Sequence, residues 1–256
     1  MLSREQITSA IREAVEPLDY VNAMWLGGSD AFQNADEWSD VDVQLDAEGG
    51  RVDDAFEAVE TALLKLSEFR LKHVLPKPTW HGHDQRFYRL KGASVHHFVD
   101  LVIMERDGGP RFNERELHGE PVVIFDKLGV IKSVANDKDK QREQIAAALS
   151  RHRDMATLTE GFVEKEVLRD NLLGAIYWHI TFVNNALQQV VRMHHSPHRF
   201  TFSLRYADMD LPKEACDELR RLLQVDGLDD VLNKHRDAQK WFWKEAESLN
   251  IDSLEL

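Results

Sequence analysis

The chain has 256 residues and 43% hydrophobic residues, which is ordinary for a globular protein and enough for one large domain or two small ones. Its formal net charge of −13 argues against the basic surface that nucleic-acid-binding proteins use, and hence against a polymerase or a tRNA-modifying enzyme. The same charge is compatible with a small substrate, in particular a cationic one attracted by the field, and equally with a charge whose main effect is solubility.

Targeting and membrane signals are missing from the expected places. No apolar run approaches the roughly 20 residues that cross a bilayer. Residues 1–6 lack a basic stretch followed by an apolar one. The single Cys216 excludes an internal disulfide framework and fits a reducing compartment. We therefore predict a cytoplasmic protein with no membrane association, and the sequence leaves the oligomeric state open.

The first half of the chain predicts a mixed α/β sheet with flanking helices. Ser3 and Gln6 form a capping box for a helix over residues 3–17. The remaining elements, in order, are a strand at 21–26, a turn or short helix at 30–38, a strand at 39–46, a helix at 52–72, a hairpin of 86–90 with 94–104, a loop at 107–110 and a strand at 121–126.

Two short motifs in this half carry the chemistry. Gly28-Ser29 follows the first strand, and a turn of this type lets the backbone approach a phosphate and offers N–H groups and a hydroxyl to it. In the strand at 39–46, acids alternate with apolar residues. Because a strand has a period of 2, Asp40 and Asp42 project from one face while Val41 and Val43 enter the core. Two adjacent carboxylates repel each other, and Mg²⁺ relieves that repulsion.

A third carboxylate lies in the later strand at 94–104. Val99 and Leu101 share its apolar face, whereas Asp100 lies on the other face together with His96.

The ordered pattern Gly28-Ser29, then Ser39-Asp40-Val41-Asp42, resembles the signature of the DNA polymerase beta-type nucleotidyltransferase superfamily. Ser29 and Asp40 are eleven positions apart, as in the family. The resemblance implies that Asp40, Asp42 and Asp100 hold Mg²⁺, that Asp100 alternatively accepts the proton of the attacking hydroxyl, and that Gly28, Ser29 and Ser39 hold a nucleoside triphosphate, ATP being the expected one. It further implies transfer of a nucleoside monophosphate, AMP by expectation, with release of pyrophosphate.

From about residue 134 the character changes to charged and amphipathic helix. We predict helices at 137–158, 164–193, 213–224 and 228–248, with the apolar helix at 164–193 in the centre of a bundle. The predicted fold is therefore of the α+β class, with a catalytic domain at 1–133 that contains the mixed sheet and an all-α helical bundle at 134–256. This plan resembles bacterial aminoglycoside and lincosamide nucleotidyltransferases, which implies antibiotic resistance, a small-molecule hydroxyl acceptor, and a general base from the bundle, for which Glu166 is the candidate.

Two alternatives remain open. Arg192 and His198 match the Arg-x(4–6)-His spacing of RNA-cleaving, HEPN-like helical domains found in toxin–antitoxin systems, although Pro197 lies inside the pattern. The run Asp30-Ala31-Phe32-Gln33 stands where members of the superfamily often carry Arg and Gly, and it motivates a sensor that binds nucleotide without transferring it.

Overall fold

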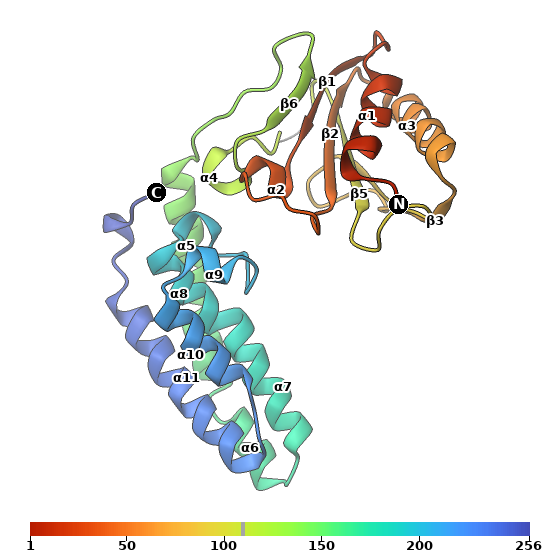
Figure 1. The fold of residues 1–256 in the computed structure, drawn as a ribbon. Coiled ribbons are helices and arrows are strands. Elements are labelled where there is room, and N and C mark those ends of the chain that lie inside the picture. The colour runs from red at the N-terminus through yellow and green to blue at the C-terminus, as the bar shows by residue number, and fades with distance from the viewer. Residues whose placement is uncertain (109–110) are drawn as a thin grey trace. The chain divides into compact units, whose positions relative to one another are not determined.

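The computed structural model describes residues 1–108 and 111–256 (Figure 1). Residues 109–110, part of the loop predicted at 107–110, lie outside the described residues. The chain divides into two compact units, Met1–Ala135 and Asn136–Leu256, which are called here the sheet unit and the helical unit. The sequence places the boundary after residue 133, and the structural units divide after Ala135.

The described part of the sheet unit is built on one mixed sheet of six strands in the order β3-β4-β5-β2-β1-β6. The central neighbours β2 and β5 run parallel, and the other paired strands are antiparallel. The predicted α+β class with a mixed sheet is confirmed. The strands are β1 Val21–Leu26, β2 Val41–Ala47, β3 Phe69–Val74, β4 Asp84–Leu90, β5 Phe98–Glu105 and β6 Val122–Asp126.

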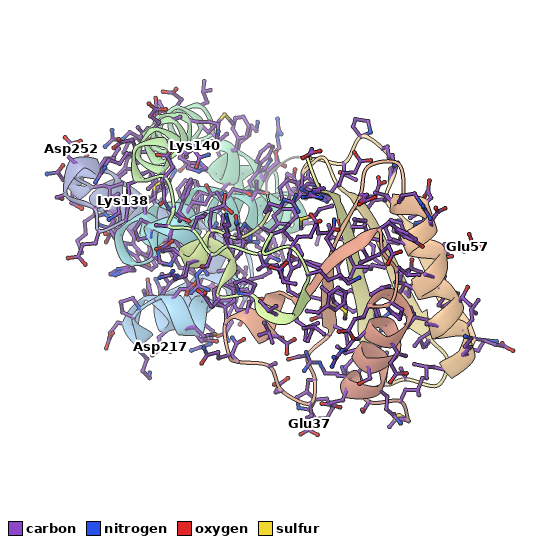
Figure 2. All side chains as sticks on the ribbon, turned by 90° about the horizontal axis from the view of Figure 1, so that it is seen from above. Glu37, Glu57, Lys138, Lys140, Asp217 and Asp252 are labelled. Carbon is purple, nitrogen blue, oxygen red and sulfur yellow. The ribbon has the colours of Figure 1, made fainter. Side chains whose placement is uncertain are left out.

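Helices α1 (Arg4–Val15) and α3 (Val52–Leu66) lie side by side against one face of this sheet (Figure 1). The predicted capping box starts α1, because Ser3 and Gln6 each bond the other's backbone N–H. Residues spaced by three and four along both helices are buried against Val41, Val43 and Leu45 of β2. Burial of each large aliphatic side chain stabilises the fold by roughly 1.5–3 kcal/mol. Glu57, on the opposite side of α3, points outward (Figure 2).

The prediction of one helix over 52–72 is wrong at its C-terminal end. Helix α3 ends at Leu66, and Phe69–Val74 forms the edge strand β3 paired with β4. The Ser67 hydroxyl accepts a hydrogen bond of 2.8 Å from the Gly92 backbone N–H, and the Glu68 carbonyl accepts one of 2.9 Å from Lys91 N–H. These bonds hold residues 67–68 beside the end of β4, so that the next residues pair with that strand. The strand pairing outweighs the helix propensity of Leu71 and Lys72.

The strand predicted at 94–104 begins later, at Phe98. Residues 94–97 form a turn instead, in which His97 N–H donates to the Ser94 carbonyl at 3.2 Å. His96 therefore precedes the strand, and its ring contacts Trp38 edge to face at 5.0 Å between ring centres. The prediction that His96 shares the strand face of Asp100 is therefore wrong, because the alternation of a strand applies only from Phe98 onward.

Two further helices of the sheet unit are short: α2 (Gly28–Ala31), which overlaps the segment predicted as a turn or short helix, and α4 (Arg115–His118).

Residues 136–256, all of which the structure describes, form helices and connecting segments. These are α5 Lys138–Leu158, α6 Phe162–Leu168, α7 Leu172–Phe182, the π-helix η1 Val183–Leu187, α8 Gln188–His195, the 3₁₀-helix η2 Pro197–Arg199, α9 Ala207–Asp210, α10 Lys213–Leu223, α11 Leu228–Ser248 and the 3₁₀-helix η3 Ile251–Ser253.

The single helix predicted at 164–193 is interrupted twice. Asp170 has a left-handed backbone with φ of 56°, and the Asn171 side chain accepts a hydrogen bond of 3.1 Å from Gly174 N–H, which starts a new helix at Leu172. The π-turn of η1 then changes the hydrogen-bond pattern at Val183. The apolar pattern continues through both interruptions, which is why it could not reveal them.

Among the described residues, none of the helices is both long and apolar enough to cross a membrane.

Candidate active site

The Gly27-Gly28-Ser29 turn joins β1 to α2 and lies against the start of β2. Gly27 N–H donates to the Asp42 carbonyl at 3.0 Å, which holds the turn beside the strand. Gly28 has φ of +53°, and a Cβ at this position would stand 1.8 Å from Asp42 Oδ2. A Cβ on Gly27 would stand 2.6 Å from Gln44 Nε2. Both the φ of Gly28 and the Asp42 side chain favour glycine at position 28, whereas the end of the flexible Gln44 side chain could move away from a Cβ on residue 27.

Asp42 and Asp100 are direct neighbours on the parallel strands β2 and β5. Parallel partners in register project from the same side of a sheet, and here it is the side opposite α1 and α3. Asp40 lies one residue before β2, and its backbone carbonyl accepts a hydrogen bond of 3.0 Å from Arg4 Nε. The predicted carboxylates therefore belong to one end of two adjacent strands.

Burial and mutual repulsion disfavour the ionised forms of two of these acids. Burial, followed by the charges of Asp40 and Asp100, raises the pKa of Asp42 to about 7. Burial likewise raises the pKa of Asp100 to about 6, while a hydrogen bond from Gln85 acts in the opposite direction. Raised carboxyl pKa values beside other acids are typical of functional sites.

The donor set fits Mg²⁺, because carboxylate oxygens are its preferred protein ligands and a divalent cation would remove the repulsion. Over residues 1–108 and 111–256, no three His, Cys, Asp or Glu side chains already stand together as a metal-binding group. One oxygen of Asp100 is held by Gln85, and Asp42 lies against Gly28. Binding an ion would therefore require Asp42 to turn toward it, whereas Asp100 could offer the oxygen that Gln85 does not bind.

The two serines of the motif differ in their contacts. Ser29 Oγ is buried and has no hydrogen-bond partner among the described residues, so a ligand oxygen would satisfy it. Ser39 Oγ donates to Asp36 Oδ1 at 2.9 Å and accepts from the Asp36 backbone N–H at 2.9 Å. Ser39 therefore closes the turn that leads into Asp40, and its hydroxyl is engaged in that turn.

Two residues that contact the site, Arg4 and Gln85, were not predicted from the sequence. Arg4 of α1 forms an ion pair with Asp30 and also bonds the Asp40 carbonyl, so it connects α1 to both ends of the 30–40 segment. Gln85 of β4 donates from Nε2 to Asp100 Oδ1 at 2.6 Å. Strand alternation in β4 could have placed Gln85 on the Asp100 face, whereas no local pattern indicates the contacts of Arg4.

Glu166, the candidate general base, lies in α6 of the helical unit and is buried. Its carboxylate accepts hydrogen bonds from Asn171 Nδ2 at 2.7 Å and from Arg169 Nη1 at 2.8 Å. The bond from Asn171, with a smaller contribution from Arg169, lowers the pKa of Glu166. In this conformation Glu166 stabilises the turn between α6 and α7, and its role as a base stays a prediction.

Arg192, from the RNA-cleaving alternative, is fully buried. Its guanidinium pairs with Asp210 at 2.6 Å and donates from Nε to the Ser203 carbonyl at 2.7 Å. These bonds fix the segment that follows α8. A buried, paired arginine holds structure together, and this geometry does not favour contact with RNA.

Comparison with known proteins yields distant structural likenesses. No family model and no curated protein matches the chain. An aminoglycoside 6-adenyltransferase from Bacillus subtilis is 14% identical, with 96% of this chain and 90% of that chain covered and a TM-score of 0.33. CdnC of E. coli MS115-1, solved with ATP, is 12% identical, with 94% and 88% covered and a TM-score of 0.31.

TM-scores below 0.5 support no conclusion about activity, substrate or partner. The function proposed below therefore rests on the residues of the site.

Proposed function

We propose that the protein is a nucleotidyltransferase that moves AMP from magnesium-bound ATP to a hydroxyl group of a small molecule. The observation that carries the proposal is the pairing of Asp42 with Asp100 on adjacent parallel strands, beside a turn in which a Cβ on Gly28 would clash with Asp42. The unpaired Ser29 Oγ at the same turn supports it, since it has no partner among the described residues.

Each residue of the site has a role in this reaction. Gly28 lets the turn approach the triphosphate, and Ser29 Oγ donates to a phosphate oxygen. Asp40, Asp42 and Asp100 would hold Mg²⁺, which when bound neutralises phosphate charge and stabilises the leaving oxygen. The acceptor oxygen bonds to the α-phosphorus and the bond to pyrophosphate breaks. In the alternative in which Asp40 and Asp42 alone hold Mg²⁺, the hydroxyl proton passes to the Asp100 oxygen that Gln85 does not bind.

The acceptor that we propose is a cationic small molecule of the aminoglycoside class. The formal net charge of −13 supports a cationic substrate, because an acidic surface raises its local concentration.

Thermal shift with nucleotides tests the proposal most directly. Wild-type protein, Asp42→Asn and the matched control Glu57→Gln would each be titrated with ATP, GTP, CTP and UTP, with Mg²⁺ or with EDTA. Glu57→Gln removes one negative charge from the outer side of α3 and leaves the site untouched (Figure 2). A ligand at 100 times its Kd stabilises a fold by about 2.7 kcal/mol, which is a shift of a few degrees.

We expect the largest shift with ATP, its dependence on Mg²⁺, its loss in Asp42→Asn and its retention in Glu57→Gln. Pyrophosphate release against an aminoglycoside panel then tests transfer. Absence of a shift with every nucleotide would count against the proposal. Binding without pyrophosphate release would favour the sensor, in which the Arg4–Asp30 pair occupies the loop that follows Ser29.

A further inference from the structure

A directed series of hydrogen bonds leads from the loop between β3 and β4 to Asp100. The His83 backbone N–H donates to His81 Nδ1 at 3.1 Å, so Nδ1 acts as an acceptor and carries no proton. A neutral imidazole has its proton on the other nitrogen, and His81 Nε2 lies 3.0 Å from Gln85 Oε1. The bond from His83 thus makes His81 Nε2 the donor to Gln85.

Asp100, at the other end of the series, also requires the side-chain amide of Gln85 to have its oxygen toward His81. An ionised Asp100 accepts hydrogen bonds and donates none, so Gln85 must present its NH₂ group to Asp100 Oδ1, at 2.6 Å. The amide oxygen of Gln85 then faces His81, where it meets the proton on Nε2. Both neighbours therefore select one of the two possible amide orientations.

Packing prevents the His81 ring from turning away. His81 is 6% exposed, and its ring meets Phe112 edge to face at 5.4 Å between ring centres. The Thr79 hydroxyl donates to the His83 carbonyl at 2.6 Å and closes the loop beside the ring. Loop and ring together form a fixed support rather than a surface side chain that happens to lie close to Gln85.

We propose that Gln85 and His81 are positioning residues that hold one oxygen of Asp100 and leave the other oxygen available to the reaction. The inference rests on the proposed function for its consequence in catalysis. Its physical basis is that residues which bond a metal-binding side chain from behind fix its orientation and affect metal affinity by about 10- to 100-fold. The amide supplies a donor to the carboxylate without adding a charge at the site.

Imidazole and amide NMR signals test this series without nucleotide or metal. The ¹⁵N shifts should show that His81 Nδ1 carries no proton and that Nε2 does. One Gln85 side-chain N–H should resonate at low field and move upfield in Asp100→Leu. A proton on His81 Nδ1, or a Gln85 signal insensitive to Asp100→Leu, would overturn the inference.

Metal affinity provides the functional test, with paired controls from the same elements. Gln85→Leu should weaken Mg²⁺ binding, measured by calorimetry with a non-hydrolysable ATP analogue, by about 10- to 100-fold. Phe87→Leu changes the next β4 residue on the same face, which lies opposite Asp100, and should stay within about twofold of wild type. His81→Phe should resemble Gln85→Leu, whereas His83→Phe keeps the backbone donor and should not.

The two proposals fail in different ways. Wild-type protein that binds neither Mg²⁺ nor nucleotide overturns the proposed function, and the NMR signals still decide whether Gln85 and His81 hold Asp100. Wild-type protein that binds both, with unchanged Mg²⁺ affinity in folded Gln85→Leu, overturns the positioning role alone. Circular dichroism and Tm verify folding of each variant.

Discussion

Gly28 and Asp42 are in such close contact that a methyl group on residue 28 would occupy the position of the Asp42 carboxylate, 1.8 Å from Oδ2. The contact joins the two halves of the motif that were separate in the sequence. It also makes the glycine a requirement of the site, in addition to its left-handed φ of +53°.

Gly28→Ala should therefore lose nucleotide binding and destabilise the protein. The backbone term costs roughly 1–2 kcal/mol, and displacement of Asp42 adds to it. Gly129→Ala is the matched control, because Gly129 has φ of +65° and a Cβ there would meet no described atom within 4 Å. Urea unfolding of both variants separates the two terms. Equal losses in the two variants would show that the contact with Asp42 is unimportant.

Stability in EDTA should fall as pH rises through the range in which Asp42 ionises. The folded protein retains the Asp42 proton up to a pKa of about 7, whereas the unfolded chain loses it near 3.8, so the unfolded state binds fewer protons between these values. The loss reaches on the order of 2–4 kcal/mol by pH 8. Urea unfolding at pH 5 and pH 8 should show it in wild type and much less in Asp42→Asn, and Mg²⁺ should reduce it.

The stability of the helical unit should change with pH in the opposite direction, falling as pH falls, because of His235. This residue is 4% exposed, and neither ring nitrogen has a hydrogen-bond partner among the described residues. Burial, with a smaller effect of His179, lowers the pKa of His235 to about 4. The unfolded chain binds this proton below about pH 6.5, so stability is lost as pH falls from about 6.5 to 4, by roughly 3 kcal/mol.

His235→Phe should reduce this acid sensitivity, and the exposed His73→Gln should leave it unchanged. The measurement is the free energy of unfolding of each variant at pH 7 and pH 5. An acid response in His235→Phe equal to that of wild type would assign the sensitivity to other groups.

Arg192 should contribute far more to stability than an exposed arginine that also forms ion pairs. Arg192→Leu removes a fully buried cation and leaves the Ser203 carbonyl and Asp210 without it, at a cost of about 3–5 kcal/mol. Arg221 pairs with Glu218 and Asp237 at the surface, and Arg221→Leu should cost less than about 1 kcal/mol. Chemical denaturation compares the two, and similar costs would contradict the structural role of Arg192.

Local sequence patterns predicted the presence of individual helices and strands but not where all of them begin and end. The capping box of Ser3 and Gln6 and the alternation around Asp40 and Asp42 are properties of neighbouring residues. Helix α1 formed within its predicted range, and β2 begins at Val41, so Asp40 precedes the strand that was predicted to contain it. The end of α3 and the break at Asp170 were missed, because they depend on a bond from Gly92 and on a side-chain cap within an unbroken apolar pattern.

The sequence by itself determined the α+β class and the chemistry of the candidate site, since residue types and a period of 2 select carboxylates beside a glycine turn. Tertiary structure decided which side chains support that site. Strand order brings Asp100 beside Asp42, and Arg4, His81 and Gln85 reach the motif from other elements. Hydrogen bonds between residues distant along the chain leave no periodic trace in it, so only the folded arrangement reveals them.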